Sequence, residues 1–228
     1  MEEQPIAPEK PGVFKVKDCA LIAIATGRRA YTLKEFRDTL LTIGKDSIYY
    51  HFWGGLVQPR FEEREYNNDF AAWLRHGIHD SRLAEQLAAV DPTAYADLEE
   101  LRIELVELVE QRLDESDYLP WVRAASQFEF IRSQIVVFDT HRRIEHPVEM
   151  AELLPRMSTT SIFYHFVDAR RRLPDGLDDF RYWLMAFTGE CGEVCRSLAE
   201  VDPYFGPLTD IRQQLVDIFN RHLGDDAP

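Results

Sequence analysis

The stretch SIYYHF at residues 47–52 returns as SIFYHF at residues 161–166, with five of six letters identical. Two further blocks recur in the same order: DFAAWL at 69–74 returns as DFRYWL at 179–184, and LAAVDP at 87–92 returns as LAEVDP at 198–203. Self-similarity of this kind indicates a repeat architecture. The sequence therefore predicts a tandem duplication in which residues 14–113 are repeated, with divergence, at residues 128–223.

The expected fold is mostly α-helical, with two tandem homologous helical domains related by a pseudo-twofold axis. The predicted boundaries are residues 12–116 for the first copy, 117–127 for a linker with a proline, and 128–226 for the second copy. The segments 13–25 and 128–139 are ambiguous, because short apolar runs rich in β-branched and aromatic residues suit a strand or a buried helix equally. Short strands are therefore an alternative in these two segments.

Several polar residues predict where helices begin. Thr32 and Glu35 form a capping-box pattern, and Ser158 suits the start of the helix that carries the second tyrosine–histidine pair. Asp91-Pro92 and Asp202-Pro203 suit a cap followed by a first helical residue, so we expect a long helix to begin at each pair.

Composition is typical of a globular cytoplasmic protein. Of the 228 residues, 45% are hydrophobic and 12% aromatic, which is enough to build buried cores. The longest apolar run, at residues 20–25, is far shorter than the roughly 20 residues of a membrane span, and the acidic start lacks the basic region of a signal peptide. Three cysteines are too few for a disulfide framework. Because the net charge is −14, we expect no nucleic-acid partner.

The sharpest candidate site is a serine, a tyrosine and a histidine on one helical face. The spacing i, i+3, i+4 brings the three polar groups together, and it occurs twice, in Ser47, Tyr50, His51 and in Ser161, Tyr164, His165. Asp69 and Asp179 also recur, and a carboxylate near the histidine would complete a Tyr-His-Asp arrangement that orients the imidazole for ligand binding or acid–base work. The structural alternative is that serine and aspartate cap helices while tyrosine and histidine bond backbone groups of a neighbouring helix.

Two arginine pairs, Arg28-Arg29 and Arg142-Arg143, stand out in this acidic chain. Each pair follows a threonine and precedes a predicted helix start, a setting that suits an anion-binding corner for a phosphorylated metabolite. The alternative is a salt bridge with one of the acidic residues. Cys191 and Cys195 lie one turn apart but have no counterpart in the first copy, so we expect core thiols, no metal and no cofactor.

The repeated Ser-Ile-x-Tyr-His and Asn-Asp-Phe-x-x-Trp signatures resemble those of a bacterial domain-of-unknown-function family whose members are often duplicated. The resemblance covers nearly the whole chain and implies a genomic neighbourhood of glycosyltransferases and α-glucan enzymes, without an activity. Similar domains often carry His-Thr-His at the tyrosine–histidine helix, whereas His51 is followed here by Phe52 and His165 by Phe166. This departure argues against a paired-histidine metal site.

These observations favour a non-catalytic binding or regulatory protein with its site in the groove between the two domains. The expected partner is another protein, an identical chain in a homo-oligomer, or a small anionic metabolite held by the two arginine pairs. One alternative is an enzyme, either a hydrolase or a sugar-processing one, that uses the Tyr-His-Asp arrangement. Another is a structural subunit of a carbohydrate-enzyme complex.

Overall fold

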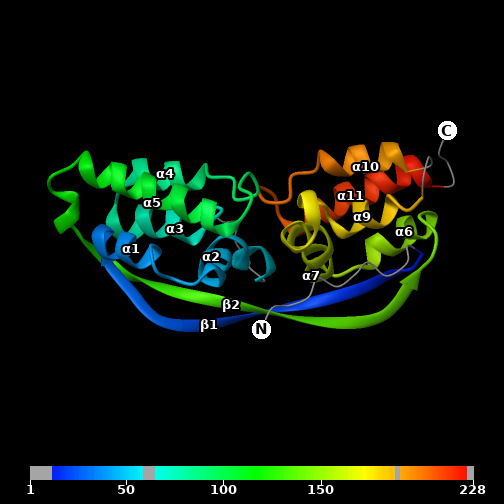
Figure 1. The fold of residues 1–228 in the computed structure, drawn as a ribbon, viewed down its shortest axis with the longest axis horizontal. Coiled ribbons are helices and arrows are strands. Elements are labelled where there is room, and N and C mark those ends of the chain that lie inside the picture. Colours follow the sequence, from blue (N-terminus) through cyan, green and yellow to red (C-terminus); the bar gives the residue numbers. More distant parts are fainter. Residues whose placement is uncertain (1–11, 59–64, 188–190, 225–228) are drawn as a thin grey trace. The chain divides into compact units, whose positions relative to one another are not determined.

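A computed structural model describes residues 12–58, 65–187 and 191–224, and it shows a mixed fold of helices and a two-stranded sheet (Figure 1). The strands are β1 (Phe14–Thr32) and β2 (Arg123–Ile144). The helices are α1 (Leu33–Leu40), α2 (Lys45–Val57), α3 (Asp69–Trp73), α4 (Ser81–Ala88), α5 (Leu98–Asp114), α6 (Val148–Leu153), α7 (Thr159–Ile162), α8 (Ala169–Arg172), α9 (Asp179–Leu184), α10 (Gly192–Ala199) and α11 (Leu208–Leu223). Two π-helical turns, Leu74–Ile78 and Phe163–Asp168, continue α3 and α7.

The prediction of a mostly α-helical chain made of two tandem helical domains is wrong. Of the described residues, 56% are helical, and 20% lie in the antiparallel pair formed by β1 and β2. Burial alternates where each strand meets the helices: Phe14 and Val16 are buried in β1, and Phe128 and Phe130 in β2, with an exposed residue between each pair. This period of two is the pattern of a strand with one covered face. The ambiguous segments therefore form strands, and the strands extend well beyond them.

The chain divides into two compact units whose boundaries fall inside the strands. Unit 1 combines residues 12–19 with 137–224 and contains α6–α11, whereas unit 2 consists of residues 20–136 and contains α1–α5. The start of β1 thus packs on helices α6–α11, and the start of β2 packs on helices α1–α5. We call this arrangement the strand exchange. The domain boundaries expected from the sequence, at residues 116 and 128, do not include this arrangement.

Aromatic side chains fix the strands to the helices of each unit. In unit 2, Phe128 of β2 contacts Phe36 and Trp73, with ring centroids 5.4 and 5.5 Å apart. In unit 1, Phe14 of β1 stacks on Phe180 at 5.3 Å, and it also contacts Trp183. Burial of large aromatic side chains dominates the energy of such contacts. The strand segments therefore supply part of each core.

Some predicted helix starts are confirmed. Thr32 caps α1, because its hydroxyl oxygen accepts the Glu35 backbone N–H at 3.1 Å. The Glu35 carboxylate accepts the backbone N–H of Tyr31 at 2.7 Å, so the second bond of the predicted capping box goes to the residue before the cap. Ser158 caps α7 in the same way, through the Ser161 backbone N–H at 3.0 Å.

The two aspartate–proline pairs do not begin helices. Asp91 and Asp202 each accept the backbone N–H two residues later, at 2.8 and 2.7 Å, and so form Asx turns. The long helices start only afterwards, with α5 beginning at Leu98 after the cap Asp97 and α11 beginning at Leu208. Among the described helices, none has the length and apolar character needed to span a membrane.

Candidate functional site

In unit 2, the serine and the histidine of the predicted tyrosine–histidine helix hold a strand. The Ser47 hydroxyl donates to the backbone oxygen of Ile131 at 2.7 Å, and Nε2 of His51 accepts the backbone N–H of the same residue at 3.1 Å. Nδ1 of His51 lies 3.0 Å from the Asp69 carboxylate. Ser47 and His51 both lie on α2, and His51 is 2% exposed. Serine and histidine therefore bind both backbone groups of one residue of β2.

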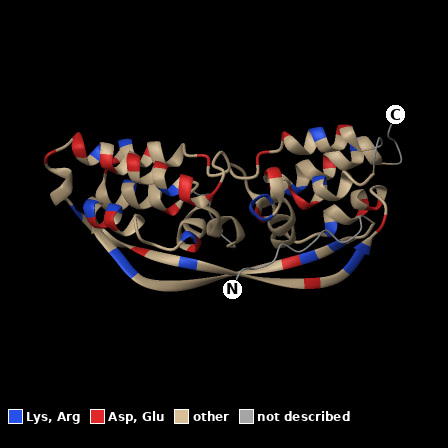
Figure 2. Cartoon of the chain, in the orientation of Figure 1, with Lys and Arg blue, Asp and Glu red and all other residues tan. Residues whose placement is uncertain are grey.

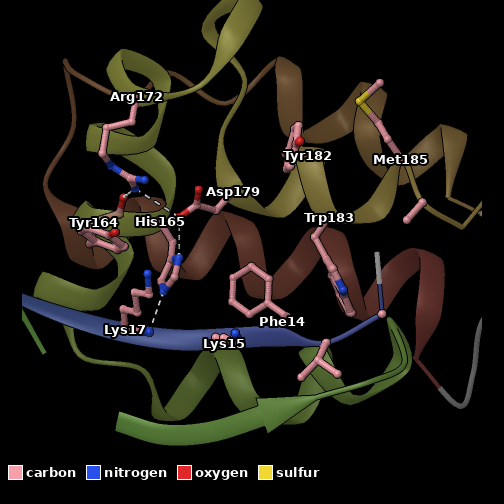
Figure 3. Close-up of a pocket in the computed structure, with 13 residues that line it drawn as sticks. Phe14, Lys15, Lys17, Tyr164, His165, Arg172, Asp179, Tyr182, Trp183 and Met185 are labelled. Carbon is pink, nitrogen blue, oxygen red and sulfur yellow. Dashed lines mark hydrogen bonds and ion pairs between the residues drawn. The ribbon is translucent and has the colours of Figure 1, made fainter. Parts of the chain in front are cut away.

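Unit 1 contains the same arrangement around Lys17 of β1 (Figure 3). The Ser161 hydroxyl donates to the Lys17 backbone oxygen, and Nε2 of His165 accepts the Lys17 backbone N–H at 2.8 Å. Nδ1 of His165 lies 2.7 Å from Asp179. We call each Ser-His-Asp group with its bound strand residue a clamp. Both clamps depend on the strand exchange, since each holds a strand residue that lies 84 or 144 positions from the clamp serine in the sequence.

The bonding pattern of a clamp defines the charge and tautomer of its histidine. Nε2 must present a lone pair to the backbone N–H, so the ring proton lies on Nδ1 and is donated to the aspartate. A protonated ring would direct a second N–H at the backbone donor. Burial agrees with the neutral form, because it lowers the pKa of His51 below the ordinary value of 6.5, against the opposing effect of Asp69. With both nitrogens engaged, the imidazole has no free lone pair for acid–base work.

The clamps decide between the two interpretations of these residues. Asp69 and Asp179 each lie within hydrogen-bond distance of a histidine, and the favoured expectation that these aspartates cap helices is wrong. The caps are the preceding residues: Asn68 accepts the Ala71 backbone N–H at 2.9 Å, and Asp178 caps α9. The expectation that the histidines bond backbone groups of a neighbouring helix is also corrected, because the bonded groups belong to a strand.

The two tyrosines lie beside the clamps without joining them. The Tyr50 hydroxyl accepts from the Gln58 side chain at 2.9 Å. The Tyr164 ring lies under the guanidinium of Arg172, whose central carbon is 4.1 Å from the ring centroid. Burial raises the pKa of the Tyr164 hydroxyl above its usual value of 10, although the charge of Arg172 opposes the shift. Arg172 lies 114 residues after Gln58, at the matching position of the sequence, so the two tyrosines have different neighbours.

The arginine pairs lie on the strands, with Arg28 and Arg29 in unit 2 and Arg142 and Arg143 in unit 1. Arg29 pairs with Glu129 at 3.5 Å, and Arg28 donates to a threonine hydroxyl at 3.2 Å. Arg143 pairs with Asp139 at 2.6 Å and lowers the pKa of that carboxyl. One arginine of each pair thus forms the salt bridge that the sequence offered as the alternative to an anion site.

The cysteines contribute no cluster of metal ligands. Within the described residues, no group of three or more His, Cys, Asp or Glu side chains is placed to hold a metal ion. Cys19 is buried in unit 1, where its thiol donates to the Thr160 backbone oxygen at 3.3 Å. Cys191 is buried at the start of α10, and Cys195 is partly buried within it.

Unit 1 has a pocket of about 900 Å³ beside its clamp (Figure 3). Its floor is the start of β1, and its walls come from α8, α9 and the turn that carries Tyr164. The lining residues are Gly12, Val13, Phe14, Lys15, Lys17, Tyr164, His165, Arg172, Asp179, Tyr182, Trp183, Met185 and Ala186. Of these, sequence reasoning named only Tyr164, His165 and Asp179 as site residues.

A signal for the other lining residues lies in the differences between the two copies. The positions of Lys15, Lys17 and Arg172 are occupied 114 residues earlier or later by Glu129, Ile131 and Gln58. Every cation of the pocket is thus replaced by an acidic, apolar or neutral residue at the matching position of unit 2. A search for residues that the copies share selects the clamp, whereas the pocket depends on residues that they do not share.

Comparison with known proteins gives a family and a fold. Residues 11–220 match a family of unknown function, DUF5752. A solved structure, described as that of OrfY from Thermoproteus tenax, has a TM-score of 0.80 over 94% of this chain and 96% of that chain, with 24% sequence identity. This similarity extends to the fold alone. No curated protein matches the chain.

Proposed function

The chain belongs to the family of unknown function DUF5752, and we propose that it is a non-catalytic binding protein whose unit 1 pocket takes a small anionic metabolite. The observation that carries the proposal is the gathering of Lys15, Lys17 and Arg172 around one pocket. The chain as a whole has a net charge of −14, and acidic residues are spread over the helices of each unit (Figure 2). Cations concentrated in a concave site favour an anionic ligand.

The geometry supports binding more than catalysis. The enzyme alternative requires a histidine that can accept or donate a proton, but His165 uses Nε2 for the Lys17 backbone N–H and Nδ1 for Asp179. His165 is also 2% exposed. A general base must reach the proton that it removes, and this imidazole is committed to the clamp. The groove between the two halves, expected from the sequence as the binding site, is replaced in this proposal by a pocket within one unit.

Recovery of a bound metabolite tests the proposal. The protein is purified without high salt and denatured, and the released small molecules are identified by negative-ion mass spectrometry. The pocket variant Lys15→Glu/Lys17→Ile introduces the residues that unit 2 carries at the matching positions, so the strand should accept them. Arg196→Gln is the control, because it removes an exposed cation on α10, whose side chain is 68% exposed.

We expect an anionic metabolite to be enriched with the wild type and with Arg196→Gln, and to be lost with the pocket variant. Equal recovery from the wild type and the pocket variant contradicts the proposal, as does the absence of any anionic species from all three. Conversion of the recovered metabolite by fresh protein would instead favour the enzyme.

A further inference from the structure

We infer that the ligand of the unit 1 pocket is a phosphomonoester attached to a ring. The inference rests on the proposed function and specifies its ligand. It is carried by the charge of the lining, by the way Arg172 is held, and by the placement of Arg172 and Lys17 at one end of the pocket and of Trp183 and Met185 at the other.

The charge of the lining matches a dianion. Three cations, Lys15, Lys17 and Arg172, line the pocket with one carboxylate, Asp179, so that the charged lining residues sum to +2. Asp168, which also pairs with Arg172, does not line the pocket and is shared with Arg171. A phosphomonoester carries about −1.5 to −2 at pH 7, whereas a carboxylate carries −1. A phosphomonoester therefore neutralises the pocket more completely than a monocarboxylate does.

Hydrogen bonds fix the Arg172 guanidinium and leave some of its N–H donors unused. Its Nε donates to Asp168 at 2.9 Å, and its Nη2 donates to the Tyr164 backbone oxygen at 2.9 Å and to Asp179 at 3.2 Å. Its Nη1 makes no hydrogen bond within the part of the chain that the structure describes. A fixed guanidinium with unused N–H groups is well suited to phosphate oxygens. The Lys17 ammonium lies 6.0 Å from the centroid of the same tyrosine ring, so that two cations lie around Tyr164.

The opposite end of the pocket is aromatic and apolar. Arg172, Tyr164 and Lys17 lie at one end, whereas Trp183 and Met185 lie at the other (Figure 3). Tyr182, which is 41% exposed, also lines the pocket. Aromatic side chains offer flat faces on which a ring of the ligand can stack. Unit 2 has alanine at residue 72 in place of Tyr182, so both ends of the pocket distinguish unit 1.

Calorimetric titration with simple probes tests the inference. The probes are phenyl phosphate, which has a dianion and a ring, inorganic phosphate, which lacks the ring, and benzoate, which has a ring and one charge. Glucose 1-phosphate adds a non-aromatic ring. We expect phenyl phosphate or glucose 1-phosphate to bind about tenfold more tightly than both inorganic phosphate and benzoate, a ratio that corresponds to about 1.4 kcal/mol.

Two variants separate the ends of the pocket. Lys17→Ile should weaken all phosphate probes by about tenfold, whereas Tyr182→Ala, which introduces the residue found in unit 2, should weaken the ring-bearing probes and leave inorganic phosphate unchanged. Arg196→Gln should change none of them. If the circular dichroism spectra of the variants match the spectrum of the wild type, misfolding is excluded as the cause of weaker binding.

Equal affinity for phenyl phosphate and benzoate would overturn the assignment of a phosphomonoester. Equal affinity for ring-bearing phosphates and inorganic phosphate would overturn the assignment of a ring. Failure of every probe to bind would also overturn the inference. Recovery of a carboxylate metabolite from the purified protein would overturn it too, while the proposed binding function would stand.

Discussion

Replacing His51 with phenylalanine removes the clamp of unit 2 while keeping an aromatic ring in place. The His51 ring packs on Phe70 and Phe128, with ring centroids 5.0 and 4.7 Å away, and a phenyl ring preserves these contacts. The Ile131 backbone N–H loses its acceptor. Asp69 loses its bond to His51 as well, but its side chain is 33% exposed, so water can replace that bond.

The cost follows from the unsatisfied backbone donor. Leaving a buried polar group without a partner costs about 1–3 kcal/mol, and Ile131 is half-buried, which places the expected cost in the lower part of this range. We therefore expect His51→Phe to reduce the free energy of unfolding of unit 2 by about 1–2 kcal/mol at pH 7.5.

Acidification should destabilise the wild type more than the variant. The pKa of His51 is lowered in the folded protein, so below pH 6.5 the unfolded chain binds a proton more readily than the folded chain. The stabilisation by neutral His51 is complete above about pH 6.5 and is lost as the pH falls toward the lowered folded-state pKa. Its limiting slope is about 1.4 kcal/mol per pH unit.

Urea denaturation at pH 7.5, 6.5 and 5.5 gives these energies, and hydrogen exchange at the Ile131 amide reports on the clamp itself. His51→Gln is a second variant, because its side-chain oxygen can accept the Ile131 N–H without titrating. It should be more stable than His51→Phe and should share its weaker dependence on pH. His76→Gln changes an exposed histidine of the same unit and should keep the slope of the wild type.

Unchanged hydrogen exchange at Ile131 in His51→Phe would refute the reasoning. Equal loss of stability on acidification in the wild type and in both His51 variants would refute the assignment of a neutral, buried imidazole.

The strand exchange predicts that the fragment 20–136 unfolds cooperatively on heating, whereas the fragment 1–116, which lacks Phe128 and Phe130, does not; equal circular dichroism melting curves would contradict this. Cys19 should resist iodoacetamide at pH 8 in the folded protein and react in urea, because burial, with the charges of Asp168 and Asp18, raises the pKa of its thiol to about 12. Peptide mass spectrometry measures the labelling, and equal native and unfolded labelling would rule out a buried, protonated thiol.

Local patterns in the sequence predict much of the helical structure. Thr32 with Glu35, and Ser158, mark helix starts because a cap depends on residues within one turn. The contact of His51 with Asp69 was only one possibility, and a helix cap was the favoured one, because no local rule gives the distance between these two residues. The starts at Asp91 and Asp202 were misplaced because an aspartate that closes an Asx turn looks like a cap in the sequence.

The strand exchange and the pocket could not be read from local patterns. Short apolar runs such as the one around Phe14 do not distinguish strand from helix, and the partner that decides the matter, His165, is 148 residues from Lys17. The pocket was missed for another reason. Comparison of the copies selects residues needed by both units, such as Ser47 and Ser161, and passes over Lys17 and Arg172, which only one copy has.

The strand exchange also sets the order in which the chain can complete its units during synthesis. Unit 2 is a continuous stretch, so all its parts are available once residue 136 has left the ribosome. The start of β1 must wait far longer, because its clamp requires Ser161, His165 and Asp179. Closing a loop of this length is entropically costly and slow. Until then Phe14 and Val16 lack their native cover, and a chaperone that shields apolar segments of nascent chains would find its binding site there.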